Sequence, residues 1–126
     1  MNVEKQNVKV GVLGTTGNGM IYDHTRVVEF LAEEVGRVTH YGLGRNGAPT
    51  DTRGTTETMY RTEDGRYIVY IQDWSHWQGE EDHYRLMEAR PEDLEPMGRF
   101  GELAEAAGMS RPLTLDEALE AEGAER

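Results

Sequence analysis

The segment Asp73–His83 (DWSHWQGEEDH) carries the side chains of this chain that are best suited to chemistry. Imidazoles and carboxylates that lie close together can ligate zinc, iron or manganese. The two histidines, His76 and His83, stand seven residues apart, which matches no established metal-binding motif. We therefore interpret the segment as a solvated acidic loop and expect no metal or other cofactor, with His76 and His83 as the candidate ligands if a metal binds.

Two tryptophans lie in the same segment, and their spacing of three allows a turn to place both indoles on one side. Tryptophan surrounded by charge is typical of the centre of a protein–protein interface. The alternative is that both indoles pack over the open end of a sheet, because tryptophan is mostly buried. The candidate partner-binding residues are Trp74, Trp77, Glu80, Glu81, Asp82 and Tyr84.

A glycine-rich loop, GTTGNG, follows the predicted strand Val8–Leu13. Glycines allow a backbone to approach phosphate closely, and the N-terminus of a following helix attracts negative charge. The candidate cofactor-binding residues are Gly14, Thr15, Thr16, Gly17, Asn18 and Gly19.

The stretch Val10–Asn18 (VGVLGTTGN) resembles the opening of atypical short-chain dehydrogenases, in which such a turn holds a dinucleotide pyrophosphate. The resemblance implies nucleotide binding at this loop. Met20–Tyr22 separate the glycines from Asp23, the predicted cap of the next helix. A plain turn between a strand and a helix is therefore our preferred interpretation, since a fold fragment carries no function by itself.

The charge of the chain is unevenly distributed. Residues 73–126 hold 15 acidic and 5 basic residues, whereas residues 1–72 hold 9 acidic and 8 basic ones. Such a field attracts basic partners and repels nucleic acids and anionic membranes. We therefore expect a basic protein as the partner and neither direct nucleic-acid nor membrane binding.

The composition predicts one domain of 126 residues with no disulfide and no thiol nucleophile, because the chain has no cysteine. Met1–Val10 lacks the apolar stretch of a signal peptide, which predicts a cytoplasmic location. Lysine is scarce while arginine, glycine and alanine are abundant, a usage that we interpret as bacterial or bacteriophage in origin.

The apolar pattern predicts a βαβ unit at the N-terminus. A strand at Val8–Leu13 precedes a helix capped by Asp23, with Val27, Val28, Leu31 and Val35 at helical spacing. Gly36 is expected to end that helix, and Arg37–Leu43 to return as a parallel strand. The turn-rich residues 44–54 are expected to form a mobile loop.

An antiparallel meander is expected over residues 55–89. Asp64-Gly65 is typical of a type I′ hairpin turn between Thr55–Thr62 and the central strand Arg66–Gln72. That turn pairs Tyr60 with Val69 and Met59 with Tyr70. A further strand is predicted at His83–Ala89.

The acidic segment 90–126 is expected to form helices packed on the sheet. Pro91 starts a first turn, and a helix from about Pro96 presents Met97, Phe100, Leu103 and Ala107 before Gly108. Thr114 with Glu117 predicts a last capped helix. The expected fold is therefore α+β, a mixed sheet in a single domain with a βαβ unit (1–54), a meander (55–89) and an acidic helical segment (90–126).

From these features we expect a small non-enzymatic accessory or regulatory protein that binds a basic protein, with homodimerisation through the small sheet. Ser75 and Ser110 are the only serines of the chain, so no serine–histidine–acid triad can be argued. Whether the chain has another enzymatic activity stays open. The alternative is a protein or enzyme that binds a nucleotide or small anion at Gly14–Gly19, with His24 or His40 nearby.

Overall fold

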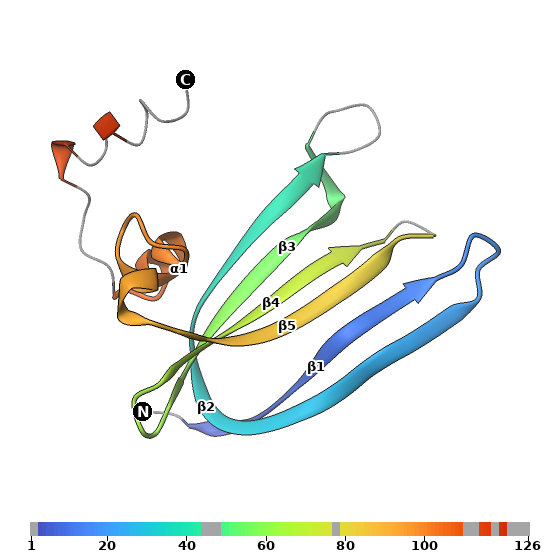
Figure 1. Cartoon of the computed structure of the whole chain (residues 1–126), viewed down its shortest axis with the longest axis horizontal. Coiled ribbons are helices and arrows are strands. Elements are labelled where there is room, and N and C mark those ends of the chain that lie inside the picture. Colours follow the sequence, from blue (N-terminus) through green and yellow to red (C-terminus); the bar gives the residue numbers. More distant parts are fainter. Residues whose placement is uncertain (1–2, 44–48, 77–78, 110–113, 117–118, 121–126) are drawn as a thin grey trace.

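Five consecutive strands close into an antiparallel barrel in the computed structural model of the chain (Figure 1). The structure describes residues 3–43, 49–76, 79–109, 114–116 and 119–120. The strands are β1 (Glu4–Thr15), β2 (Ile21–Leu43), β3 (Pro49–Thr62), β4 (Tyr67–Ser75) and β5 (Glu81–Ala89). A short 3-10 helix (Pro91–Leu94) and α1 (Gly101–Ala106) follow them.

The predicted βαβ unit and the mixed sheet are wrong. Residues 21–43 form the single strand β2, which pairs antiparallel with β1 and with β3. Val28 packs in the barrel core while Val27, its neighbour, is 65% exposed, as the two faces of a strand require. β-branched residues favour this outcome, because they lose little side-chain freedom in an extended backbone. Asp23 caps no helix and instead accepts the Thr25 amide at 2.9 Å.

Gly36 marks a bulge in β2 and not the end of a helix. The β2–β3 register shifts between Glu34 and Gly36, close to the point where β2 passes from β1 to β3. Because a bulge increases the local bend and twist of a strand, β2 can belong to both sides of the barrel. The predicted loop 44–54 is too long, because β3 begins at Pro49 and residues 49–54 belong to this strand.

The predicted hairpin exists, but its register differs by one residue. Thr62 donates its amide to the Arg66 carbonyl at 2.9 Å, and Gly65 donates to the Thr62 carbonyl at 3.1 Å. Gly65 has φ +84, whereas Asp64 does not have a positive φ. This is a three-residue loop built on a type I turn with glycine in the left-handed position, and not a type I′ turn.

The one-residue difference changes which side chains share a face. Tyr60 lies opposite Ile68 and Met59 lies opposite Val69. The remaining meander is as predicted: β4 lies between β3 and β5, and both pairings are antiparallel.

Two clusters of apolar side chains lie on opposite faces of the β3–β4–β5 sheet. The first fills the barrel with residues from all five strands, centred on Val8, Ala32, Tyr60 and Tyr70. Tyr70 also donates its hydroxyl to the Lys9 carbonyl at 2.6 Å, which ties β4 to β1 across the interior. The second cluster lies outside the barrel under the C-terminal segment, and it contains Met59, Val69, Ile71, Ala89, Phe100 and Leu103.

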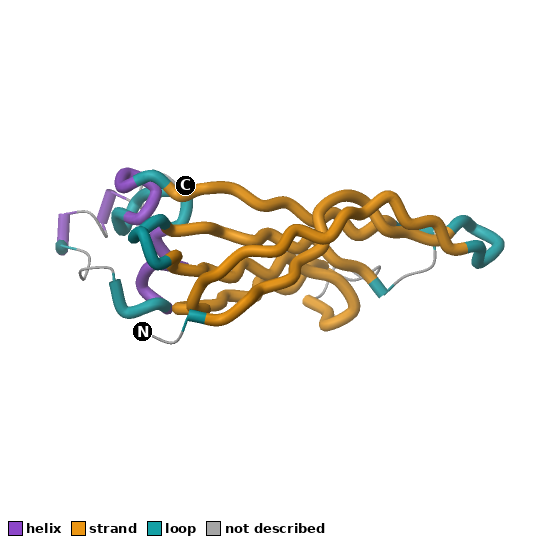
Figure 2. Tube along the Cα trace, turned by 90° about the horizontal axis from the view of Figure 1, so that it is seen from below, coloured by secondary structure: helices purple, strands orange, loops and turns teal. Residues whose placement is uncertain are grey.

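The C-terminal segment is less helical than predicted. Pro91 begins a 3-10 turn as expected, but α1 begins only at Gly101 and packs on the outer face of β2 and β3, at the end of the molecule where Figure 2 shows the helices. Of the predicted face, Phe100 and Leu103 are buried, whereas Met97 is 55% exposed. The helix ends at Ala106 with Ala107 as its C-cap, and Gly108 follows with φ +72.

The predicted last helix is only partly described, because Glu117, one half of its capping box, lies outside the described residues. Leu115 and Leu119 are 74% and 58% exposed, so these two side chains do not pack on the sheet.

Candidate binding site at the barrel rim

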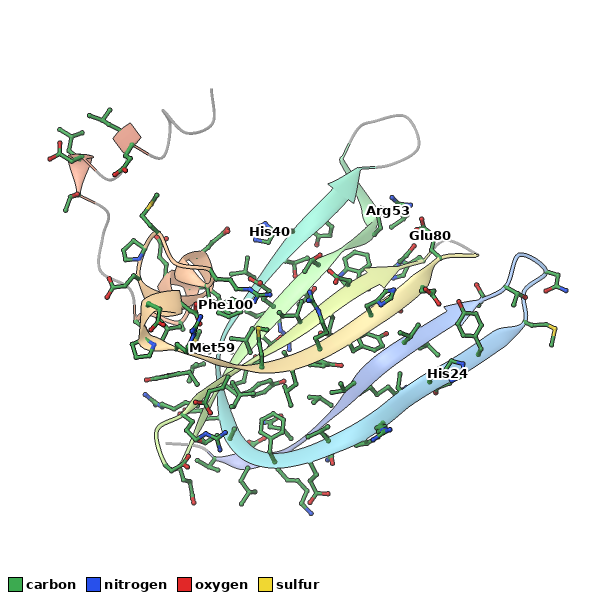
Figure 3. The ribbon with its side chains drawn as sticks, in the orientation of Figure 1. His24, His40, Arg53, Met59, Glu80 and Phe100 are labelled. Carbon is green, nitrogen blue, oxygen red and sulfur yellow. The ribbon has the colours of Figure 1, made fainter. Side chains whose placement is uncertain are left out.

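One end of the barrel gathers the residues expected to bind a partner. The end of β4 and the start of β5 meet there beside the β1–β2 turn, on the side of the barrel away from α1 (Figure 1). Figure 3 shows Arg53 and Glu80 together at this rim. The β1–β5 ladder explains the gathering, because the two strands pair antiparallel and Gly14, near the end of β1, lies opposite Glu81 at the start of β5.

A hollow of about 600 Å³ opens at the rim. Three carboxylates line it, those of Asp73, Glu80 and Glu81, together with the guanidinium of Arg53. The rings of Tyr22, Trp74 and His83 complete the charged and aromatic part of its wall.

The carboxylates of this hollow are held by neighbours from distant parts of the chain. Glu81 accepts the Tyr22 hydroxyl at 2.8 Å, and this hydrogen bond raises the pKa of Tyr22. Asp73 accepts the Thr55 hydroxyl at 2.6 Å. Two of the three carboxylates of the hollow, Glu81 and Asp73, are thus positioned by hydrogen bonds from residues of other strands.

Glu80 bridges two strands at the boundary of the hollow. It forms an ion pair with Arg53 of β3 and accepts the hydroxyl of Ser75 at the end of β4. Because Glu80 and Ser75 also line the neighbouring hollow, this pair forms the wall between the two.

A second hollow of about 490 Å³ lies on the other side of that wall. Leu13, Thr15 and Ile21 give it an apolar side, and Asp82 gives it a charged one. Asp82 accepts the Ser75 amide at 2.7 Å and the Tyr84 hydroxyl at 2.9 Å. Burial, together with this carboxylate, raises the pKa of Tyr84 well above its ordinary value of 10.0.

Trp74 belongs to β4 and not to a loop. Its indole donates to the Thr56 hydroxyl at 3.0 Å and meets the Tyr41 ring edge-on, with centroids 6.1 Å apart. It lies over Gly54, where an added Cβ would come within 2.9 Å of indole Cζ2. Trp74 is thus half-buried and lines the first hollow, and its binding of a partner stays a prediction. Trp77, the second predicted anchor, lies outside the described residues.

Gly14–Gly19 do not lead into a helix. Gly14 and Thr15 end β1, and Gly19, with φ +87, closes a hairpin turn into β2. The Tyr22 ring lies over Gly14, with its hydroxyl 2.6 Å from where a Cβ would stand, so a side chain at this position would displace the end of the Tyr22 ring. The predicted phosphate binding depended on a helix N-terminus, and the structure has a strand in its place. Cofactor binding at this loop stays a prediction.

The candidate metal ligands point to different partners. His83 lies 3.5 Å from Glu81, whereas the His76 ring lies 5.2 Å from that of Trp74. Among the residues that the structure describes, no group of three or more His, Cys, Asp or Glu is arranged to hold a metal ion. His24 neighbours the Tyr22 ring, and His40 pairs with Glu102 of α1 at 3.1 Å.

Sequence reasoning found the acidic half of the rim and missed Tyr22 and Arg53. Tyr22 is 59 residues from Glu81, and Arg53 is 27 from Glu80. Both were expected in other elements, Tyr22 before a helix and Arg53 in a loop. Only the barrel topology, in which the ladder places Gly14 between Tyr22 and Glu81, brings them to the site.

No protein-family model, curated protein or solved structure matches the chain. None of the helices described here is long and apolar enough to cross a membrane.

Proposed function

We propose that this chain is a small cytoplasmic, non-enzymatic accessory protein that binds a basic protein through the acidic rim of its barrel. The observation that carries the proposal is the pair of hollows at the rim. Among the described residues that line them, four are carboxylates (Asp73, Glu80, Glu81 and Asp82) and one, Arg53, is a permanent cation.

The first hollow suits an arginine or lysine side chain of the partner. Glu81 and Asp73 remain 43% and 42% exposed, so a cation from outside can reach both. Their present contacts, of Glu81 with the His83 imidazole at 3.5 Å and of Asp73 with the Arg85 guanidinium at 3.6 Å, are long and solvent-exposed. Such pairs contribute little, so exchange for a better-placed cation carries only a small penalty.

The aromatic rings of the hollow add to this preference. A guanidinium or ammonium group is attracted to the face of an indole or phenol ring, and Trp74 and Tyr22 both line the hollow. A planar guanidinium can also donate two hydrogen bonds to one carboxylate. An arginine of the partner is therefore the best-fitting group.

The alternative function, binding of a nucleotide or small anion at Gly14–Gly19, has less support. Glu81 lies opposite Gly14 in the β1–β5 ladder, and Glu80 and Asp82 line the hollow beside Gly14 and Gly19. These carboxylates repel an anion. A rise in melting temperature that grows with the logarithm of the NADPH or ATP excess over Kd would favour the alternative instead.

Charge reversal tests the proposal. The partner is first isolated from an extract of the host on the immobilised chain, and its association rate is then measured at low and high salt. Glu81→Lys reverses a charge at the hollow, whereas Glu105→Lys makes the same change on α1 at the far end. We expect Glu81→Lys to slow association about tenfold and Glu105→Lys to have a much smaller effect.

The wild-type association rate should also fall steeply as salt rises, because exposed charges are screened. Circular dichroism tests whether both variants are folded. If Glu81→Lys is unfolded, Glu81→Gln replaces it in the measurement. The proposal would be contradicted if the two charge reversals had equal effects and the association rate did not depend on salt concentration.

A further inference from the structure

The N-terminal half of β2 has an open backbone edge. Residues 21–31 pair with β1 along one side, from Thr15↔Ile21 to Lys5↔Leu31. Pairing of β2 with β3 begins only at Ala32. Within the described part of the chain, the other edge of residues 21–31 therefore has no ladder partner. Figure 1 shows this edge as the outer border of the β1–β2 hairpin.

This edge carries the charged residues Asp23, Arg26 and Glu29 but lacks the other features that usually prevent strands from pairing between molecules. Natural edge strands are short or carry lysine, proline or a bulge. The segment Ile21–Leu31 contains neither lysine nor proline, its register against β1 is unbroken, and it extends over about 33 Å at 3.3 Å per residue. Ile21, Val27 and Leu31 are 76%, 65% and 56% exposed.

The charge of the β1–β2 hairpin favours a second copy of the chain as the partner that pairs with this edge. The whole chain carries a net charge of −11, so two copies repel each other over most of their surfaces. Residues 4–31 hold three acidic and three basic residues, and they include both lysines of the chain. Two copies can meet at this hairpin without net repulsion.

A two-fold axis perpendicular to the sheet would pair the two β2 edges antiparallel and keep equivalent faces on the same side. With the axis at Val27, each Glu29 lies opposite Thr25, each Arg26 opposite Val28 and each Asp23 opposite Leu31. No like charges then face each other. An axis at Arg26 would instead place two guanidinium groups opposite each other, which is destabilising.

We propose that the chain forms a two-fold dimer in which the open β2 edges, residues 21–31, pair antiparallel about Val27. The pairing would also cover the half-buried Val28 and Phe30, which pack at the margin of the barrel core. The dimer edge shares Ile21 and Tyr22 with the lining of the two hollows, whereas none of the four carboxylates of the acidic rim belongs to it.

Cysteine trapping tests the register. The chain has no cysteine, so Val27→Cys introduces a single thiol that meets its own copy at the axis. Directly opposite Cα atoms in antiparallel strands are about 4.5–5.5 Å apart, which is within the range of a disulfide. We expect Val27→Cys to form a covalent dimer under mild oxidation. Met97→Cys, on another exposed apolar residue, is the control and should stay monomeric on a denaturing gel.

Sedimentation of the uncross-linked protein tests the dimer itself. The wild-type chain should show twice the monomer mass with rising concentration, and Val27→Lys should weaken the association about tenfold or more while Met97→Lys leaves it unchanged. A wild-type chain that stays monomeric at millimolar concentration would overturn the proposal. So would a dimer that Val27→Lys does not weaken and Val27→Cys does not trap.

Discussion

Gly36 of β2 and Ala107 at the end of α1 lie so close that a Cβ on Gly36 would stand 2.9 Å from the Cβ of Ala107. The same glycine lies at the bulge where the β2–β3 register shifts. The end of the C-terminal helix therefore packs directly on the bend of the longest strand. This contact joins the outer apolar cluster to the point where β2 passes between its two partners.

Gly36→Ala should destabilise the protein by about 1–3 kcal/mol, because the new methyl group overpacks a contact with backbone atoms that cannot easily move. Gly17→Ala is the matched control, since a Cβ there meets no atom within 4 Å. Urea unfolding followed by circular dichroism measures both. Equal midpoints for the two variants would show that α1 moves away from β2 without penalty.

Gly65→Val should cost about 1 kcal/mol or more, because valine tolerates poorly the φ of +84 that the hairpin loop requires. Crowding plays no part, since a Cβ at this position also meets no atom within 4 Å. Gly17→Val makes the same side-chain change at a glycine without a positive φ. The denaturation midpoint should fall for Gly65→Val alone, and an unchanged midpoint would argue against the left-handed turn.

Phe100→Ala should destabilise the protein by about 3–5 kcal/mol, since Phe100 is 1% exposed in the outer cluster and its loss leaves a cavity beside Met59 (Figure 3). Met97→Ala removes a large apolar side chain that is 55% exposed and should change stability by less than about 0.5 kcal/mol. Thermal unfolding of the two variants compares them. A similar loss for both would place Met97 in the core as well.

Stability should decrease as pH rises above the ordinary tyrosine pKa of 10.0, because the native state keeps the Tyr84 proton to a higher pH. Below that value both states are protonated, and the contribution of Tyr84 to stability is fully present. Above it the unfolded chain releases the proton while the folded chain holds it, so the contribution is progressively lost.

Tyr84→Phe should therefore flatten the alkaline decline in the unfolding free energy. Tyr41→Phe, which changes a ring that is 59% exposed, provides the control. The measurement is urea unfolding at a series of pH values from neutral to strongly alkaline. An identical slope for wild type and Tyr84→Phe would mean that this hydroxyl is not held as the structure shows.

Features that depend on a few adjacent residues could be predicted from the sequence. The strand at Val8–Leu13, the turn at Asp64-Gly65, the 3-10 turn at Pro91 and the stop before Gly108 all follow from local apolar alternation or backbone restriction. The meander over residues 55–89 follows as well, because consecutive strands joined by short turns pair with each other. The exact register of the hairpin did not follow, since two- and three-residue loops suit the same Asp-Gly pair.

Features that depend on distant pairing could not be predicted. The apolar residues Val27, Val28, Leu31 and Val35 fit a helix and a strand alike, and the pairing of β2 with β1 and β3 decides between them. The candidate site divides in the same way. Glu80, Glu81 and Asp82 were recognised by type, but Tyr22 and Arg53 join them only when β1 pairs with β5 and closes the barrel. Residue types and turns are local properties, whereas strand partners depend on which surfaces bury each other, and that only the tertiary structure decides.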